Sequence, residues 1–550
     1  MRKRKEEKLE QKNKVNKKKR NDNTVKSSGT SLGKPSAKKN IDSYNAESDE
    51  NHQTINKQVN VQSMNGNNHE FSQDESKEEI KKEHTNREIM LVTYIFIGLL
   101  ILTLGYFIKF IFADSSEVIN NAYNQRQDLL AEHIVRGDII SSDGKILAHT
   151  NVDSNGKETR VYPYDSMFAH VVGRFSKGRT GLEASENFRL LTSNDNPISK
   201  IFRELSGDKN KGDNVVTTLN SNLQKVAYDA LGNHKGAVVV MEPSSGKILA
   251  MVSKPDYDPN KIDTLWEGLL EDDEKNSALL NRATQGLYPP GSTFKILTSL
   301  EYILENPDYE SYGYNCEGKG LFNSVIINCY NNKKHGQEDL KESFAKSCNS
   351  SFAEIGTTLN IRSFRKLCNT FLFNAPIPTS MIYNRSSFVL TGDTDKSEIP
   401  QTVIGQGKTQ ITPLHNALIV STIANGGVMM KPYLVDHIEN YNGIIVKKYM
   451  PEIYNSLITP DQSQILTSFM TEVVENGTAT ALKGKKYTVA GKTGSAEYEA
   501  NKPAHAWFVG FAPAEKPEIA VSIIVESVGT GSEYAVPVAS KIFDAYFKNK

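Results

Sequence analysis

Cysteine and tryptophan are scarce in this chain, which has four Cys and two Trp among its 550 residues. No two of Cys316, Cys329, Cys348 and Cys368 have the C-x-x-C spacing of many metal sites, and the H-E-x-x-H pattern is absent too. Because the eleven His are also scattered, we expect no metal and no other cofactor. Cys316 and Cys329 flank a short loop. In an oxidising location they could form a disulfide, and the sequence does not decide whether they do. Cys348 is expected to be a packing residue.

Net charge is lacking as well, because 65 Lys and Arg balance 65 Asp and Glu. Residues 1–88 are rich in Lys, Asn, Ser, Glu and Gln and nearly free of aromatic residues, a composition that predicts a disordered tail. A basic run at residues 17–20 would also suit nucleic-acid binding. The apolar segment that follows favours a cytoplasmic tail, so we expect no nucleic-acid partner.

The apolar segment at residues 89–113 is about 25 residues long, enough to cross a bilayer as a helix. Lys109 is its only charged residue and lies near one end. The length of the segment and its distance from the start argue against a cleaved signal peptide, whereas a buried core helix remains an alternative. Since the basic tail precedes the span, we expect a single-pass membrane protein with a cytoplasmic N-terminus and an extracytoplasmic remainder.

The rest of the chain divides into two parts without internal repeats. Residues 114–232 read as a domain of mixed structure, and residues 233–550 as a larger α+β domain. Strands are expected at 236–242, 247–253, 487–493, 505–512 and 518–526. Two strands at the start and three at the end, with helices between them, predict one antiparallel sheet covered by helices on both faces.

Three short blocks in the larger domain carry chemistry. Ser292 and Lys295 form an S-x-x-K block, Ser347 and Asn349 an S-x-N block, and residues 492–494 a K-T-G block. S-x-x-K and S-x-N also occur in polar tails of this chain and mean little alone, whereas K-T-G occurs once. In this order the blocks can supply a nucleophile, a base, a proton relay and a clamp for a carboxylate.

The first block opens a run of apolar residues at helical spacing and directly follows Pro-Pro-Gly at residues 289–291. Ser292 is therefore expected at the N-terminus of a buried helix, where the helix dipole favours a developing oxyanion. Lys295 returns to the same face and, in a dry site, can lose its proton and act as base. A capped helix with a solvated lysine is the alternative for this block taken alone.

The other two blocks have equally plain alternatives. Ser347 can pass a proton and the Asn349 amide can hold a substrate backbone, but both are also ordinary helix caps. Lys492 and Thr493 can bind a terminal carboxylate, and Gly494 lets a substrate strand approach closely. The alternative for K-T-G is a turn at a strand edge with a solvated lysine.

Taken together, the sequence resembles the class B, monofunctional penicillin-binding proteins over about residues 115–545. Further matching stretches lie at residues 136–148, 181–183, 236–246 and 405–414. The family usually has Thr after K-T-G, where this chain has Ser495. The resemblance implies a dimerisation-like pedestal at 114–232 and a transpeptidase domain at 233–550 with a five-stranded sheet.

The resemblance also implies an activity, that of a peptidoglycan D,D-transpeptidase. Ser292 would form an acyl-enzyme with a stem peptide ending in D-Ala-D-Ala, and the backbone N–H groups of Ser292 and Ser495 would hold the oxyanion. β-Lactams would trap the same serine. A polytopic membrane glycosyltransferase is the implied partner.

Two alternatives stay open. A D,D-carboxypeptidase or β-lactamase would use water in place of the acceptor amine, although no convincing E-x-x-x-N element for deacylation lies between Asn349 and Lys492. A non-catalytic β-lactam sensor would be expected to carry further membrane spans or a cytoplasmic effector domain. Whether the protein acts in elongation, division or sporulation is left open by the sequence.

Overall fold

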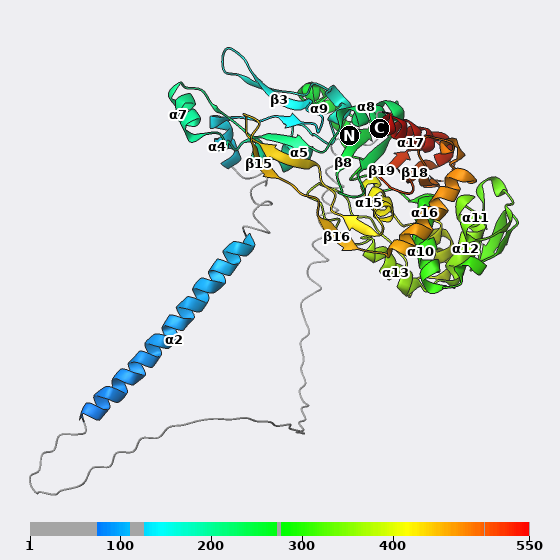
Figure 1. Cartoon of the computed structure of the whole chain (residues 1–550), viewed down its shortest axis with the longest axis horizontal. Coiled ribbons are helices and arrows are strands. Elements are labelled where there is room, and N and C mark those ends of the chain that lie inside the picture. The colour runs from blue at the N-terminus through cyan, green and yellow to red at the C-terminus, as the bar shows by residue number, and fades with distance from the viewer. Residues whose placement is uncertain (1–73, 111–125, 272–276, 500, 549–550) are drawn as a thin grey trace, which may run out of the picture. The chain divides into compact units, whose positions relative to one another are not determined.

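The computed structural model of the chain describes residues 74–110, 126–271, 277–499 and 501–548 (Figure 1). Residues 1–73 of the predicted tail (1–88) and residues 111–113 at the end of the predicted span lie outside these residues. Helix α2 spans Asp74–Lys109. It begins inside the segment predicted to be disordered, because residues 74–88 are rich in the good helix formers Glu and Lys.

The second part of α2, Asn86–Lys109, is a candidate membrane span. Its 24 residues are apolar and exposed, and no other helix among the described residues is both as long and as apolar. A helix in a protein core would be buried, so the buried-helix alternative is wrong for this segment. The chain thus carries a helix whose length and composition suit a membrane anchor.

A six-stranded sheet organises the first folded part of the chain. Its strand order is β15-β14-β6-β2-β3-β4. The strands are β2 (Ile139–Ile140), β3 (Ile146–Val152), β4 (Glu158–Val161), β6 (Asn214–Thr217), β14 (Val435–Glu439) and β15 (Ile445–Lys448). The last two strands come from far along the chain, so a single boundary near residue 232 does not separate the two parts. Around the sheet lie α4 (Arg126–His133), α5 (Gly181–Ser185), α6 (Asn187–Leu190), α7 (Pro197–Leu205) and the short pair β1 (Ile134–Val135) and β5 (Asn210–Lys211).

A buried ion cluster joins three elements of this part. The Glu183 carboxylate accepts hydrogen bonds from Nε of Arg136 and from Nε of Arg160, each at 2.7 Å. The side chains are 0–4% exposed. The buried Glu183 carboxylate is thus paired with two guanidinium groups, and this contact links the stretches around residues 136 and 183.

The larger part is built on a five-stranded antiparallel sheet with the order β17-β18-β19-β7-β8. The strands are β7 (Gly236–Met241), β8 (Ile248–Lys254), β17 (Ala490–Ala496), β18 (His505–Ala512) and β19 (Ile519–Val525). This confirms the predicted sheet, except that β17 starts and ends three residues later than expected. All residues of β7, β18 and β19 are buried, so both faces of the sheet are covered.

Helices supply this cover (Figure 1). α8 (Ser221–Leu231) and α17 (Gly531–Phe547) contact each other and the sheet, and α15 (Pro413–Ala424), buried along its whole length, contacts β7, β18 and β19. The remaining helices are α9 (Ile262–Glu271), α10 (Lys295–Glu305), α11 (Leu340–Ala345), α12 (Asn349–Thr358), α13 (Ile361–Thr370), α14 (Ile399–Val403) and α16 (Pro460–Glu475). Three two-stranded sheets complete the part: β9 (Tyr314–Cys316) with β12 (Gly336–Glu338), β10 (Lys319–Phe322) with β11 (Val325–Asn328), and β13 (Val428–Met430) with β16 (Ile453–Ser456).

Candidate active site

Ser292 lies in a tight turn that two backbone segments force into place. A 3₁₀ turn, Gly291–Phe294, precedes α10, so Ser292 lies just before the α-helix, which begins at Lys295. Gly291 has a positive φ of 54°, and its N–H donates to the carbonyl of Gly405 at 2.9 Å. A Cβ on Gly405 would lie 1.9 Å from the Gly291 oxygen, so this crossing requires glycine.

Lys295 is fully buried in the first turn of α10. Its Nζ donates to the backbone oxygen of Ser347 and to Oδ1 of Asn349, both at 2.8 Å, and to Oγ of Ser347 at 3.3 Å. Burial lowers the pKa of Lys295 to about 8, since a charged amine is poorly solvated there. Among the described residues no hydrogen bond joins Lys295 to the Ser292 hydroxyl. Such a contact often tightens only when substrate binds.

Ser347 and Asn349 hold the start of α12 against this lysine. Ser347 has a positive φ of 59°, a strained conformation for a residue with a Cβ. The Asn349 amide donates to the carbonyl of Asn328, the last residue of β11, at 3.0 Å. The residue between them, Cys348, is the N-cap of α12. The S-x-N block thus contacts Lys295 and also caps the N-terminus of α12.

Lys492 lies within β17 and points into the protein, not into open solvent. It is fully buried, and its Nζ donates to Oγ of Ser347 at 2.9 Å and to the oxygen of Thr493 at 3.1 Å. Burial, and then the charge of Lys295, lower its pKa well below the ordinary value. The Ser347 hydroxyl therefore accepts from two lysines. The solvated lysine of the strand-turn alternative is wrong.

A cavity of about 1550 Å³ brings six of the predicted residues to one surface. They are Ser292, Ser347, Asn349, Thr493, Gly494 and Ser495. Lys295 and Lys492 do not line it, and both donate a hydrogen bond to Ser347, which does. The sequence analysis missed Thr478, which lines the cavity and whose hydroxyl lies 2.5 Å from that of Thr493. Thr478 stands alone after α16 and offers no sequence signal.

β17 is an edge strand of its sheet, so its outer edge can pair with an extended peptide. Its register places Ser495 opposite Ala506 of β18. A Cβ on Gly291 would lie 3.1 Å from the Ser495 oxygen, so this strand passes directly beside the turn that carries Ser292. Gln406 of the Gly-Gln-Gly loop donates to the same oxygen at 3.3 Å. A bound peptide on β17 would run past the Ser292 hydroxyl.

Glu472 and Asn476, near the end of α16, have the E-x-x-x-N spacing that a deacylating pair would need. The Asn476 amide donates to the Glu472 carboxylate at 2.5 Å, and neither residue lines the cavity. Their position therefore gives no support to the β-lactamase alternative.

Sequence comparison decides the family. Residues 236–544 match the model of the penicillin-binding protein transpeptidase domain, and residues 136–215 match that of the penicillin-binding protein A dimerisation domain. The first of these models alone matches more than half of the chain. The chain belongs to the penicillin-binding protein transpeptidase family. Its α+β architecture and five-stranded antiparallel sheet are those expected from the sequence.

Relatives of this penicillin-binding protein include two named peptidoglycan D,D-transpeptidases. PbpA of Mycolicibacterium smegmatis is 34% identical over 76% of this chain and 89% of its own length. MrdA of Acinetobacter baumannii is 27% identical over 70% of this chain and 66% of its own length.

Solved structures agree with the sequence relatives. The imipenem acyl-enzyme complex of penicillin-binding protein A from M. tuberculosis matches with a TM-score of 0.69 and 30% identity, over 75% of this chain and 98% of that one. Penicillin-binding protein 2 from Pseudomonas aeruginosa matches with a TM-score of 0.65 and 27% identity, over 76% and 96%.

Proposed function

We propose that this protein is a peptidoglycan D,D-transpeptidase with Ser292 as its nucleophile. The observation that carries the proposal is the joint placement of three groups around one cavity. Ser292 and Ser347 line the cavity, Ser347 accepts hydrogen bonds from two buried lysines, and an edge strand runs alongside. The names of the relatives above support the same activity.

Acylation begins when Ser292 Oγ attacks the carbonyl carbon of the penultimate D-Ala. Lys295 takes the hydroxyl proton, a role that suits a buried amine with a pKa of about 8. The backbone N–H groups of Ser292 and Ser495 hold the oxyanion. A single such donor contributes roughly 3–4 kcal/mol to lowering the barrier.

Collapse of the tetrahedral intermediate breaks the peptide bond to the terminal D-Ala. Its nitrogen needs a proton, and Ser347 Oγ delivers one that the adjacent lysine ammonium replaces. The sequence assigned the substrate carboxylate to Lys492 and Thr493. Because Lys492 is buried, we propose that the hydroxyls of Thr493 and Thr478 contact the carboxylate directly, while Lys492 orients Ser347.

The acyl-enzyme is then attacked by an amine of a neighbouring stem peptide, which forms the cross-link and frees Ser292. A β-lactam resembles the D-Ala-D-Ala end and acylates the same serine. Water in place of the amine would give a D,D-carboxypeptidase, so the two activities differ only in the acceptor. Incubating the purified full chain with a labelled stem peptide and an amine acceptor separates them by product.

Mass spectrometry of the β-lactam adduct tests the nucleophile. The label is expected on Ser292, and Ser292→Ala is expected to remove it while Ser495→Ala keeps it. A label on another serine in the wild-type protein would overturn the assignment.

The membrane placement is part of the same proposal. With α2 in the membrane and the basic tail in the cytoplasm, the cavity lies outside the cell beside the peptidoglycan. The pedestal match to a dimerisation domain supports contact with another protein, which we propose is a polytopic glycosyltransferase that supplies glycan strands. Protease added to intact protoplasts is expected to digest residues after 114 and spare a tag near residue 10. Glycan polymerisation by the protein alone would exclude the partner.

A further inference from the structure

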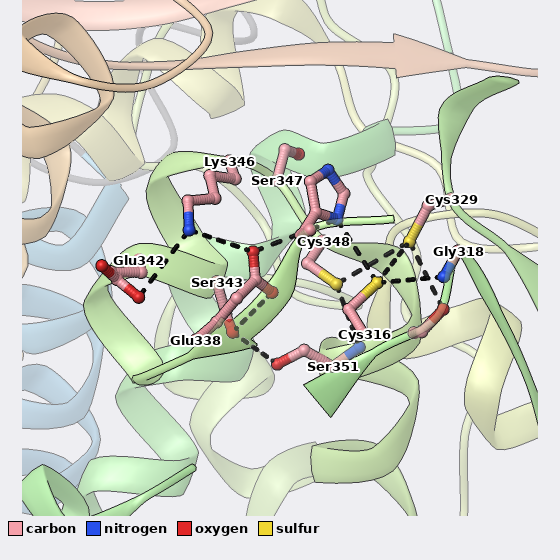
Figure 2. Close-up of polar contacts among 12 residues, drawn as sticks. Cys316, Gly318, Cys329, Glu338, Glu342, Ser343, Lys346, Ser347, Cys348 and Ser351 are labelled. Carbon is pink, nitrogen blue, oxygen red and sulfur yellow. Dashed lines mark hydrogen bonds and ion pairs between the residues drawn. The ribbon is translucent and has the colours of Figure 1, made fainter. Parts of the chain in front are cut away.

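Three cysteines and a histidine converge beside the active site, and the proposed transfer reaction uses none of them (Figure 2). We name Cys316, Cys329, His335 and Cys348 the thiol cluster. The cysteines are 0–2% exposed and the His335 side chain 7%. They come from the end of β9, the residue after β11, the loop before β12, and the N-cap of α12.

The spacing of the thiol cluster is that of a tetrahedral metal site. Sγ of Cys316 lies 3.6 Å from Sγ of Cys329, which lies 3.7 Å from Sγ of Cys348. Nδ1 of His335 lies 3.4 Å from Sγ of Cys316, and all four ligand atoms lie within 4.8 Å of one another. With Zn–S near 2.3 Å and Zn–N near 2.0 Å, a tetrahedron has S–S edges of about 3.8 Å and S–N edges of about 3.5 Å.

The same distances argue against the disulfide that the sequence left open. A disulfide needs an S–S distance of about 2.05 Å, and all four cysteines of the chain are free thiols. A disulfide would also use two sulfurs and leave Cys348 and His335 without a function in the cluster. One metal ion would bind all four converging ligands, whereas a disulfide would use only two of them.

Two of the three sulfurs accept hydrogen bonds from backbone N–H groups. The backbone N–H of Gly318 donates to Sγ of Cys316, and that of Ser351 donates to Sγ of Cys348, each at 3.4 Å. Such hydrogen bonds are typical of the shell around metal-bound thiolates. The buried carboxylate of Glu338 lies on the same side, with Oε1 4.0 Å from Nδ1 of His335 and 3.7 Å from the ammonium of Lys346.

We infer that the thiol cluster binds one Zn²⁺ and that this ion holds the wall of the active site that carries Ser347 and Asn349. Three thiolates and one imidazole form a closed, four-coordinate set, which is characteristic of structural zinc. Binding releases the protons of the thiols as the metal enters. The sequence predicted no metal, because the ligands are spread over residues 316–348 and meet only in the fold.

Two ligands are covalent neighbours of residues in the S-x-N turn. Cys348 lies between Ser347 and Asn349, so fixing its sulfur fixes the strained Ser347 backbone. Cys329 follows Asn328, whose carbonyl holds the Asn349 amide at 3.0 Å. The metal therefore acts as a positioning group for Ser347 and Asn349 without touching substrate.

Metal content tests the site directly. Elemental analysis of the full chain, purified in detergent without chelator, is expected to give about one zinc per chain. X-ray absorption is expected to give three sulfurs near 2.3 Å and one nitrogen near 2.0 Å. Cys316→Ser, Cys329→Ser and His335→Ala should each lower zinc content, whereas Cys368→Ser, a buried cysteine in α13 outside the cluster, should retain it.

Three results overturn the site. The wild-type protein with reduced thiols could fail to take up added Zn²⁺. A Cys316–Cys329 disulfide could be found in non-reduced peptides. The Cys368→Ser variant could lose zinc as completely as Cys329→Ser. None of these measurements uses a β-lactam, so they stand or fall independently of the proposed transpeptidase activity.

The positioning role has its own readout. Zinc is removed from the wild-type protein with a chelator, and Ser292 acylation is measured across β-lactam concentrations. The saturating acylation rate should fall several-fold and recover when Zn²⁺ is added, while far-UV circular dichroism stays the same. An unchanged acylation rate in protein shown to be metal-free excludes the positioning role. A changed circular dichroism spectrum, with no recovery of the acylation rate on adding Zn²⁺, excludes it as well.

Discussion

The two sides of the active-site cavity are held in place in different ways. On one side β17 pairs with β18 along all seven of its residues, and the sheet behind it is buried on both faces. On the other side, β9 to β12 are strands of three or four residues in separate two-stranded sheets, with Leu321 and Ile326 more than 60% exposed. Two-stranded pieces are marginally stable in water. The β17 side therefore rests on the core, and the thiol-cluster side needs local cross-links.

The two lysines provide the sharpest test of this contrast. Lys295→Ala should slow acylation by about 10²–10⁴-fold, because it removes the proposed general base. Lys492→Ala should slow it less, and equally for a β-lactam with a carboxylate and a serine-reactive probe without one, since Lys492 acts through Ser347.

Second-order acylation rates for both probes check this expectation. If Lys492→Ala slows only the carboxylate-bearing probe, the amine reaches the substrate and the direct clamp suggested by the sequence is right.

A core substitution on the β17 side should lower the free energy of unfolding more than a substitution on the thiol-cluster side. Ile523 of β19 is fully buried and Ile326 of β11 is 63% exposed. Ile523→Ala should lower the free energy of unfolding by about 2–5 kcal/mol, and Ile326→Ala by at most about 0.5 kcal/mol. Chemical denaturation of the two variants measures both, and equal losses would show that the short strands are part of the core after all.

The pH dependence of acylation should follow Lys295. Its folded pKa of about 8 lies below the ordinary value, and the reaction needs the neutral amine. The rate should therefore rise about tenfold per pH unit below 8 and level off above it. Stopped-flow acylation between pH 6 and 9.5 gives the profile. A rate that is flat over this range would mean that Lys295 is not the base.

The smallest effect on acylation is expected from a substitution in β17. Ser495→Thr restores the residue usual in the family, and the register opposite Ala506 fixes its backbone N–H whatever the side chain. Acylation should change by less than about twofold, equal to roughly 0.4 kcal/mol. A larger change would assign the Ser495 hydroxyl a role beyond that of its backbone.

Much of the catalytic part could be predicted because its signals are local. The apolar periodicity after Pro-Pro-Gly predicted α10, and the five predicted strands lie within three residues of their observed bounds. What was missed depends on distant pairing. Nothing near residues 435–448 indicates that β14 pairs with β6, and nothing near Lys492 indicates that its amine is buried against Ser347.

The site itself shows the same limit. The three sequence blocks identified most of the candidate catalytic residues. The thiol cluster, in contrast, is assembled from four separate elements. Thr478 adds its hydroxyl from a turn that has no recognisable sequence motif. Single residues that meet only through tertiary structure carry no periodicity and no motif, so sequence reasoning had no means to place them.

The crossing of Gly291 and Gly405 has a consequence for how this protein can evolve. The two backbones touch where any side chain on Gly405 would collide with the Gly291 oxygen. A side chain at this crossing would therefore displace the turn that carries Ser292, and with it the proposed nucleophile. Resistance has to arise elsewhere on the cavity rim. Glu497 and Lys502 line the opening with exposed side chains, where a substitution would leave the turn that carries Ser292 in place.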